Sequence, residues 1–286
     1  MSSPIPSEAA IRLTVFLGVF VSMALWELAV PFRSLTTPRR RRWWRNLSLV
    51  ASYTLLVRVT LPAGAVGMAY VAEDRGLGVL NAVSLPAWLA VVSSVLVLDF
   101  VIYLQHVMFH AVPALWRLHM VHHADLDFDV TTGARFHPIE ILLSMAIKLG
   151  SVALLGPPVV AVLLFEVVLN ATAMFNHGNV RLPPRLDRAL RFLIVTPDMH
   201  RVHHSVKPQE CNSNFGFNLP WWDRLLGTYI AEPAVGQERM TIGLSHNREP
   251  RQTLVWMLLL PFRGRPGSYP FGRRPGGASA AGSPQA

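Results

Sequence analysis

Long apolar runs fill the first part of the chain and predict membrane-spanning helices. Residues 13–32 are uncharged apart from Glu27 and are long enough for one bilayer crossing, which takes about 20 residues. No basic segment precedes this run and no small-residue cleavage site follows it, so we expect a retained helix and not a signal peptide. A second run covers 47–72 and is interrupted only by Arg58.

Two further apolar runs follow. Residues 77–104 form a third predicted span whose only charge is Asp99. Residues 141–176 are also apolar, but Gly156, Pro157 and Pro158 interrupt them. Because proline ends a helix and glycine favours a turn, this run predicts two short helices in a hairpin and not one long span.

The distribution of arginine predicts how the helices are oriented. Segment 33–45 carries six arginines and no acidic residue, so we expect it on the cytoplasmic side. The loop at 73–75 has no positive excess and is expected outside, which returns the third span to the cytoplasm near His106. The sequence therefore predicts an all-α integral membrane protein with three spans, a short helical hairpin and a cytoplasmic histidine-rich helical cap.

Composition excludes other classes of protein. Of the 286 residues, 51% are hydrophobic and 15% are charged, whereas a soluble domain has about 25% charged residues. The net charge of +9 lies beside apolar runs without any nucleic-acid-binding motif, which argues against nucleic acid as a partner. Cys211 is the sole cysteine, so an internal disulfide and a cysteine-based zinc or iron–sulfur site are excluded.

Histidines carry the candidate chemistry, because ten of the 11 lie between His106 and His204. Residues three or four apart share one face of a helix, so such a pair can bind one metal ion. Adjacent residues diverge by about 100°, so each His-x2-His-His triad can face two neighbouring metals. We take the isolated His246 as structural. The grouped histidines are His106-x3-His110, His119-x2-His122-His123 and His200-x2-His203-His204, with His137 and His177 standing singly.

The residues alone leave the metal open, because neutral imidazole suits iron, zinc, copper and nickel. Four-coordinate zinc would leave several histidines unused, whereas two six-coordinate irons would use them. The chain contains no Glu-x-x-His, which excludes a carboxylate-bridged di-iron bundle, and no His-Glu-x-x-His, which argues against a zinc protease. Haem with two histidine ligands would need single histidines on facing helices.

An ordered series of motifs over roughly 95–230 resembles the fatty acid hydroxylase/sterol desaturase superfamily of membrane di-iron oxygenases. Leu226 departs from the pattern, since phenylalanine is usual there. The motifs are Asp99-x3-Tyr103-x2-His106-x3-His110, Leu115-Trp116-x2-His119-x2-His122-His123, Arg135-Phe136-His137-Pro138-x-Glu140, Asn176-His177, Thr196-Pro197-x2-His200-x2-His203-His204-Ser205, Asn214-Phe215-Gly216 and Trp222-Asp223-Arg224-Leu225-Leu226-Gly227-Thr228.

The resemblance implies an O2-dependent enzyme that hydroxylates or desaturates a lipid. Two irons are expected at the cytosolic face of the membrane, which we expect to be the inner membrane of the cell. Electrons are expected from a separate reductase, ferredoxin or cytochrome. Two alternatives stay open: a zinc-dependent hydrolase of membrane lipids, and a metal carrier or sensor without catalysis. The implied ligands are His106, His110, His119, His122, His123, His200, His203 and His204, with His177 and His137 as additions.

Several polar residues are candidates for supporting these ligands. Asp99 lies two helical turns before His106, so it is predicted to orient a histidine or to pair with Arg58. Tyr103 lies between Asp99 and His106 and is a candidate for lining the substrate path. We interpret 222–224 as structural. Candidate acceptors near the triads are Asp125, Asp198 and Asn179.

These features divide the chain into three predicted regions. Residues 1–94 hold the N-terminal transmembrane helices, and 95–232 form the hydroxylase/desaturase-like catalytic region. Residues 233–286 form a C-terminal extension that is expected to be disordered from about 264 because it is rich in glycine, proline and serine. Arginines recur every three residues over 183–195, which predicts an amphipathic helix either in the membrane interface or on a cytosolic cap.

Overall fold

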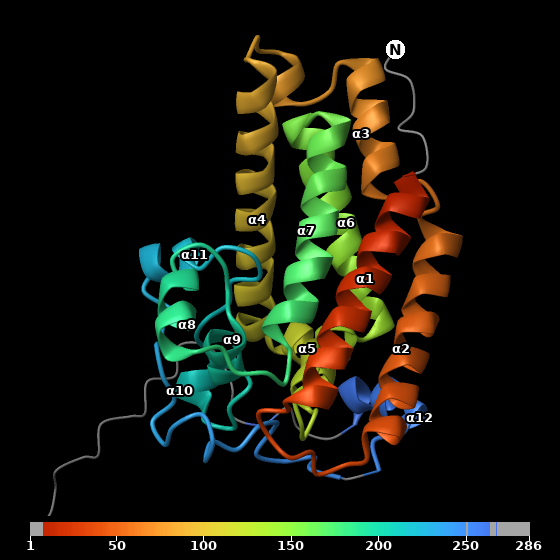
Figure 1. Ribbon diagram of the computed structural model, residues 1–286. Coiled ribbons are helices and arrows are strands. Elements are labelled where there is room, and N and C mark those ends of the chain that lie inside the picture. Colours follow the sequence, from red (N-terminus) through yellow and green to blue (C-terminus); the bar gives the residue numbers. More distant parts are fainter. Residues whose placement is uncertain (1–7, 250, 264–266, 268–286) are drawn as a thin grey trace, which may run out of the picture.

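A computed structural model describes residues 8–249, 251–263 and 267, and within them the regular secondary structure is helical (Figure 1). Five segments are long and apolar enough to cross a membrane, which confirms the predicted all-helical membrane architecture. They are α1 (Glu8–Ala29), the segment Arg39–Asn81 with α2 (Arg39–Thr60), α3 (Gly64–Arg75) and η1 (Val79–Asn81), α4 (Ala87–Ala111), α6 (Pro138–Leu155) and α7 (Val159–Asn176).

The predicted break in the fourth apolar run lies at Gly156, where α6 ends and the chain turns into α7. Gly156 has a φ of 64°, and a Cβ there would come within 2.4 Å of the carbonyl oxygen of Leu77, so only glycine fits this turn. Each helix has 18 residues, which makes both longer than the short helices expected.

Small side chains allow the long helices to pack closely. On α3, Ala65 and Ala69 are buried against Val162 and Phe165 of α7, and Leu98 of α4 completes this core. Close packing of small residues is how helices associate where lipid removes the hydrophobic driving force. Large apolar side chains on the outside of the bundle stay exposed, as expected for a surface that faces lipid; examples are Leu13, Leu17, Leu55, Trp88 and Leu154.

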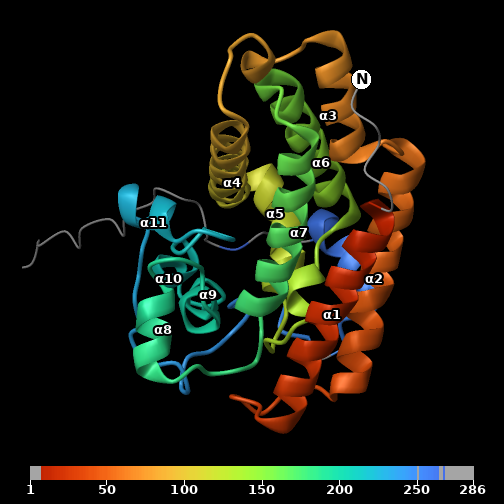
Figure 2. The same cartoon turned by 45° about the horizontal axis from the view of Figure 1, so that its top comes forward.

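Short helices form a cap at one end of the bundle. Figures 1 and 2 agree that most of them lie to one side of the long helices. After α4 ends, Pro113 begins the first cap helix. A proline at this first position costs no hydrogen bond, because the N–H that it lacks would have no partner within the helix. The cap helices are α5 (Pro113–His123), α8 (Pro184–Leu190), α9 (Pro197–His203), α10 (Pro208–Cys211), α11 (Trp221–Leu225) and α12 (Leu254–Leu259), with the short turns η2 (Thr132–Ala134) and η3 (Leu260–Phe262).

The amphipathic helix predicted over 183–195 is shorter than expected, because α8 ends at Leu190. Its arginines also do not form one polar stripe. Arg191 is buried and its Nε lies 2.6 Å from a carboxylate oxygen of Asp187, whereas Leu186 and Leu193 are exposed. The repeat of arginine every three residues therefore includes a buried ion pair, that of Arg191 with Asp187, and is not only a feature of the helix surface. The predicted tail from 264 falls almost entirely outside the described residues.

A buried arginine joins the bundle to the cap. Arg42 of α2 pairs with Asp125 through both terminal nitrogens, and its Nε donates to Asp129 at 3.2 Å. Burial alone would raise the pKa of Asp129, but Arg42 and Thr131 outweigh it and lower that pKa. Arg42 is thus a structural ion-pair partner in addition to being one of the arginines of segment 33–45.

Glu27 makes a second connection between the bundle and the cap. Its side chain is fully buried on α1, and one carboxylate oxygen accepts hydrogen bonds from the backbone amides of Val130 at 2.7 Å and Asn179 at 2.8 Å. A charge in an apolar helix is costly unless it is paired in this way. Glu27 therefore fixes two loops of the cap against α1.

Replacing Arg42 by methionine is expected to lower the free energy of unfolding by about 3–5 kcal/mol, because Asp125 and Asp129 would remain buried without their cation. The exposed Arg41 is the matched control, and Arg41→Met should leave stability unchanged. Denaturant titration of the purified protein in detergent measures both variants. Equal stability of the two variants would contradict the structural role given to Arg42.

Candidate metal centre

Nine histidines meet in two buried groups where the bundle joins the cap. Within each group the candidate ligand atoms all lie within 4.8 Å of one another. We call them the first cluster and the second cluster. The first cluster is His106, His110, His119, His123 and His203, and the second cluster is His122, His177, His200 and His204.

Helix geometry distributes the triads between the clusters as the spacing predicts. On α5, His123 turns to the first cluster and His122 to the second, with their ring planes 88° apart. Likewise His203 and the next residue, His204, face different clusters with ring planes 79° apart. The divergence of adjacent residues on a helix thus places two metal-binding groups side by side.

The rings of the first cluster are oriented by acceptors behind them. His106 Nδ1 donates to the carbonyl oxygen of Phe215 at 2.8 Å, and His203 Nδ1 donates to that of Ser213 at 2.7 Å. His119 Nδ1 lies 2.6 Å from a carboxylate oxygen of Glu140. Because carbonyl oxygens only accept, Nδ1 carries the proton in the neutral rings of His106 and His203, and their Nε2 atoms carry lone pairs that point into the cluster.

Those lone pairs point at one another. The Nε2 atoms of His106 and His119 are 3.1 Å apart, and Nε2 of His110, His123 and His203 has no hydrogen-bond partner among the described residues. Two lone pairs at this distance repel, and buried polar atoms are rarely left without a partner. A cation between the nitrogens would satisfy all of them.

The second cluster follows the same rule. His177 Nδ1 donates to the carbonyl oxygen of Ala173 at 2.7 Å, which leaves a lone pair on its Nε2. That Nε2 lies 3.2 Å from Nε2 of His122 and 3.1 Å from Nε2 of His200. Neither ring nitrogen of His204 has a hydrogen-bond partner among the described residues.

Both clusters fit a metal ion by donor chemistry. Burial lowers the pKa of His119 and of His177 to about 3, so these imidazoles are neutral and able to ligate at neutral pH. Two nitrogens bonded to one metal at about 2.1 Å lie about 3.0–3.4 Å apart. The observed separations of 3.1–3.2 Å fall in this range.

One loop, residues 212–217, supplies three of the acceptors. Besides the carbonyls of Ser213 and Phe215, the side-chain oxygen of Asn212 lies 3.1 Å from His110 Nδ1. Asp223 holds this loop, because its carboxylate accepts from the amides of Phe215 and Gly216, both at 2.8 Å. Asp223 thus binds the preceding loop and, by accepting from the hydroxyl of Thr228 at 2.7 Å, also the turn that follows it, in keeping with the structural role expected for 222–224.

Asp99 and Tyr103 also contact this part of the cap. Asp99 accepts from Trp222 Nε1 at 2.7 Å, and the Tyr103 hydroxyl lies 2.8 Å from the hydroxyl of Thr228. The structure therefore joins Asp99 to neither a histidine nor Arg58. Tyr103 does not line the cavity described below.

Other candidates lie away from both clusters. His137 caps α6, where its Nδ1 accepts from the amide of Ile139 at 3.2 Å. Asp125 and Asp198 form ion pairs with arginines, and Asn179 accepts from the amide of Arg33. Glu140 and the backbone carbonyls contact the histidines instead. Glu140 lies in a motif that can be recognised in the sequence. A backbone carbonyl that accepts a hydrogen bond cannot be recognised there, because every residue type has one.

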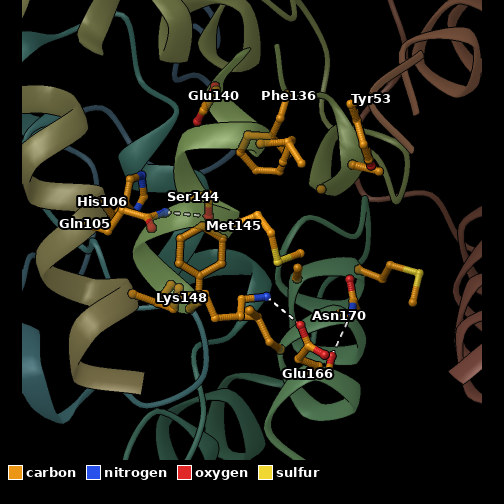
Figure 3. Close-up of a pocket in the computed structure, with 18 of the residues that line it drawn as sticks. Tyr53, Gln105, His106, Phe136, Glu140, Ser144, Met145, Lys148, Glu166 and Asn170 are labelled. Atoms are coloured by element: carbon orange, nitrogen blue, oxygen red, sulfur yellow. Dashed lines mark hydrogen bonds and ion pairs between the residues drawn. The ribbon is translucent and has the colours of Figure 1, made fainter. Parts of the chain in front are cut away.

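A cavity of about 280 Å³ borders the first cluster (Figure 3). His106, His119 and Glu140 lie at this end of it, and apolar side chains such as Phe109 and Phe136 form much of the wall. The histidines of the second cluster do not line it. A molecule in this cavity would therefore reach the first cluster alone.

Comparison with known proteins identifies similar sequences. Residues 91–228 match the sequence model of the fatty acid hydroxylase family. The chain is 35% identical to the ornithine lipid hydroxylase OlsE of Rhizobium tropici over 150 residues, which are 52% of this chain and 44% of that protein. It is 31% identical to the alkylglycerol monooxygenase of Xenopus tropicalis over 153 residues, which are 52% of this chain and 31% of that protein.

A methylsterol monooxygenase of Arabidopsis thaliana, named 2-2, is 27% identical over 158 residues, which are 54% of this chain and 59% of that protein. The aligned stretch thus spans less than half the length of the first two relatives. No solved structure matches the chain.

Replacing Glu140 by leucine is expected to weaken metal binding about 10–100-fold, because His119 would lose the acceptor that orients its ring. Glu140→Gln keeps an acceptor oxygen and should retain most of the affinity. Ser144→Ala, one turn along the same face of α6, is the control. Competition with a chelator measures the affinities, and a leucine variant with wild-type affinity would contradict this role.

Proposed function

We propose that the chain is a membrane-bound di-iron oxygenase, because residues 91–228 match the sequence model of the fatty acid hydroxylase family. It would use O2 and two electrons to hydroxylate or desaturate a C–H bond of a lipid. The observation that carries this proposal is the convergence of nine histidines, with lone pairs directed inward, into two adjacent buried groups. Two irons with up to six ligands each use such a donor set more fully than four-coordinate zinc does.

Iron held by these histidines supplies the redox chemistry that activates O2 toward an unreactive C–H bond. The protein residues do the remaining work. Phe109, Phe136 and Phe217 give the cavity an apolar wall that excludes water and receives a lipid chain. Glu140 holds the His119 ring in place beside that chain. The cavity thus presents one part of a substrate to the first cluster.

The proposal includes a separate electron carrier and a cytoplasmic site. The 286 residues contain one cysteine, which is too few for a cysteine-ligated iron–sulfur cluster of their own. The arginine-rich segment 33–45 lies at the same end of the bundle as the clusters, because Arg42 pairs with Asp125 just beyond His123. By the positive-inside rule this end faces the cytoplasm, which suggests the inner membrane of the cell.

Elemental analysis of detergent-purified protein is the first test. We expect about two irons per chain in the wild type and at most about one in His203→Ala, which lacks a first-cluster donor. His246→Ala is the matched control, because His246 belongs to neither cluster, and it should keep both irons. Lipid-dependent O2 consumption should be lost with His203→Ala and retained with His246→Ala.

Other results of the elemental analysis and of the O2 measurement would contradict the proposed oxygenase. Zinc without iron, even after anaerobic supplementation with iron, would contradict the oxygenase and favour a zinc-dependent hydrolase of membrane lipids. Two irons without any lipid-dependent O2 consumption would leave a metal-binding protein and contradict the proposed catalysis.

A further inference from the structure

The cavity that borders the first cluster contains a second group of charged residues at its other end. Figure 3 shows Lys148, Glu166 and Asn170 there, away from His106 and Glu140. Arg12 of α1 completes this group. We call Arg12, Lys148 and Glu166 the ion triad.

The ion triad contains more positive than negative charge. Lys148 Nζ lies 2.8 Å from one carboxylate oxygen of Glu166, and a terminal nitrogen of Arg12 contacts the other oxygen. The Nε of Arg12 also pairs with Glu8 at 2.8 Å, but Glu8 is partly exposed and does not line the cavity. Two cations on the cavity wall thus share one buried carboxylate.

Lys148 retains donors that could bind a ligand. An ammonium group has three N–H donors, and Glu166 is the sole acceptor that the described residues offer it. Its side chain is largely buried, with 11% exposed, so water does not freely satisfy the other two. Charged groups within apolar helices are costly and commonly mark a substrate path.

A neighbouring cavity also borders the ion triad through Arg12. This space of about 250 Å³ shares Arg12, Phe16 and Asn170 with the first cavity and is also lined by Arg58. It lies between α1, α2 and α7, among apolar side chains such as Leu13 and Val167. Two arginines, Arg12 and Arg58, thus line the space next to the cavity that contains Lys148.

We propose that the ion triad is a subsite for an anionic oxygen group, a carboxylate or a phosphate, on the lipid that the enzyme oxidises. Calling this lipid a substrate rests on the proposed function, but binding at the subsite can be tested without turnover. Charge-assisted hydrogen bonds from Lys148 and Arg12 would hold the anion. The apolar part of the cavity would hold the chain.

The length of α6 between the two ends sets the distance from the anion to the reacting carbon. Glu140, beside His119, and Lys148 are eight residues apart on one face of α6, which is about 12 Å along the helix. The C–H bond presented to the first cluster therefore lies well along the chain and not beside the anionic group. The site would oxidise a lipid tail at a position remote from its charge.

Binding of two matched probes tests the subsite. Radiolabelled palmitate and hexadecanol have the same chain length and differ in charge, and their affinities can be measured on metal-loaded protein without a reductant. We expect palmitate to bind at least about tenfold more tightly, as one or two charge-assisted hydrogen bonds imply. Lysophosphatidate with the same chain distinguishes a phosphate source from a carboxylate source, since the preferred anion should bind more tightly.

Matched variants separate recognition from folding. Lys148→Met removes the charge and keeps an unbranched side chain, so it should cut palmitate and lysophosphatidate binding at least about tenfold and leave hexadecanol binding within about twofold. Lys207→Met, at the other lysine of the chain, is exposed on the cap and should change neither. Glu166→Gln leaves both cations and should bind the anionic probes at least as tightly as wild type.

The outcomes distinguish failure of the subsite from failure of the proposed function. Equal loss of hexadecanol and the anionic probes in Lys148→Met would mean that the ion triad only holds the helices together. The subsite would be overturned if the wild-type protein bound all three probes with equal affinity, or if it bound neither anionic probe. Charge-dependent binding in a protein that consumes no O2 with any lipid would sustain the subsite and overturn the oxygenase.

Discussion

The repulsion between imidazole lone pairs is the constraint on which the rest of the structure depends. His106 and His119 place their Nε2 atoms 3.1 Å apart, and His106 cannot relieve the contact by donating a proton. Its Nδ1 proton is already donated to the carbonyl oxygen of Phe215, and His119 Nδ1 lies 2.6 Å from a carboxylate oxygen of Glu140. The acceptors behind the rings therefore do more than orient them, because they fix the tautomer that makes a cation the natural partner of the cluster.

That constraint explains why the cap is tied so firmly to the bundle. The first cluster takes rings from α4 and from cap helices, and the second combines His177, directly after α7, with histidines of the cap, so a shift of the cap would separate the donors. Arg42, Glu27 and Asp99 each sit on a long helix and bind a cap segment, through Asp125, Val130 and Trp222 respectively. Charges that are costly within apolar helices thus hold the two halves of the metal centre in register.

The sequence predicts the long helices and the division of the triads, because both follow from local periodicity. Apolar runs of about 20 residues specify spans, and a rotation of about 100° per residue separates His122 from His123. The acceptors could not be predicted in this way. Asp125 is near the triad in sequence but pairs with Arg42, whereas the carbonyls of Ser213 and Phe215 reach the histidines through the tertiary path of the chain. His137 shows the same limit, since its motif position gives no sign that it caps α6.

The two clusters are unequal in their surroundings. The cavity reaches rings of the first cluster, whereas aromatic side chains cover the second. Phe136 stacks on His122 with ring centroids 4.5 Å apart, and Phe128 stacks on His177 at 5.4 Å. Phe136 also lines the cavity, so this ring lies against both the cavity and His122. A molecule in the cavity would therefore contact the first cluster, whereas the second cluster is enclosed by aromatic rings.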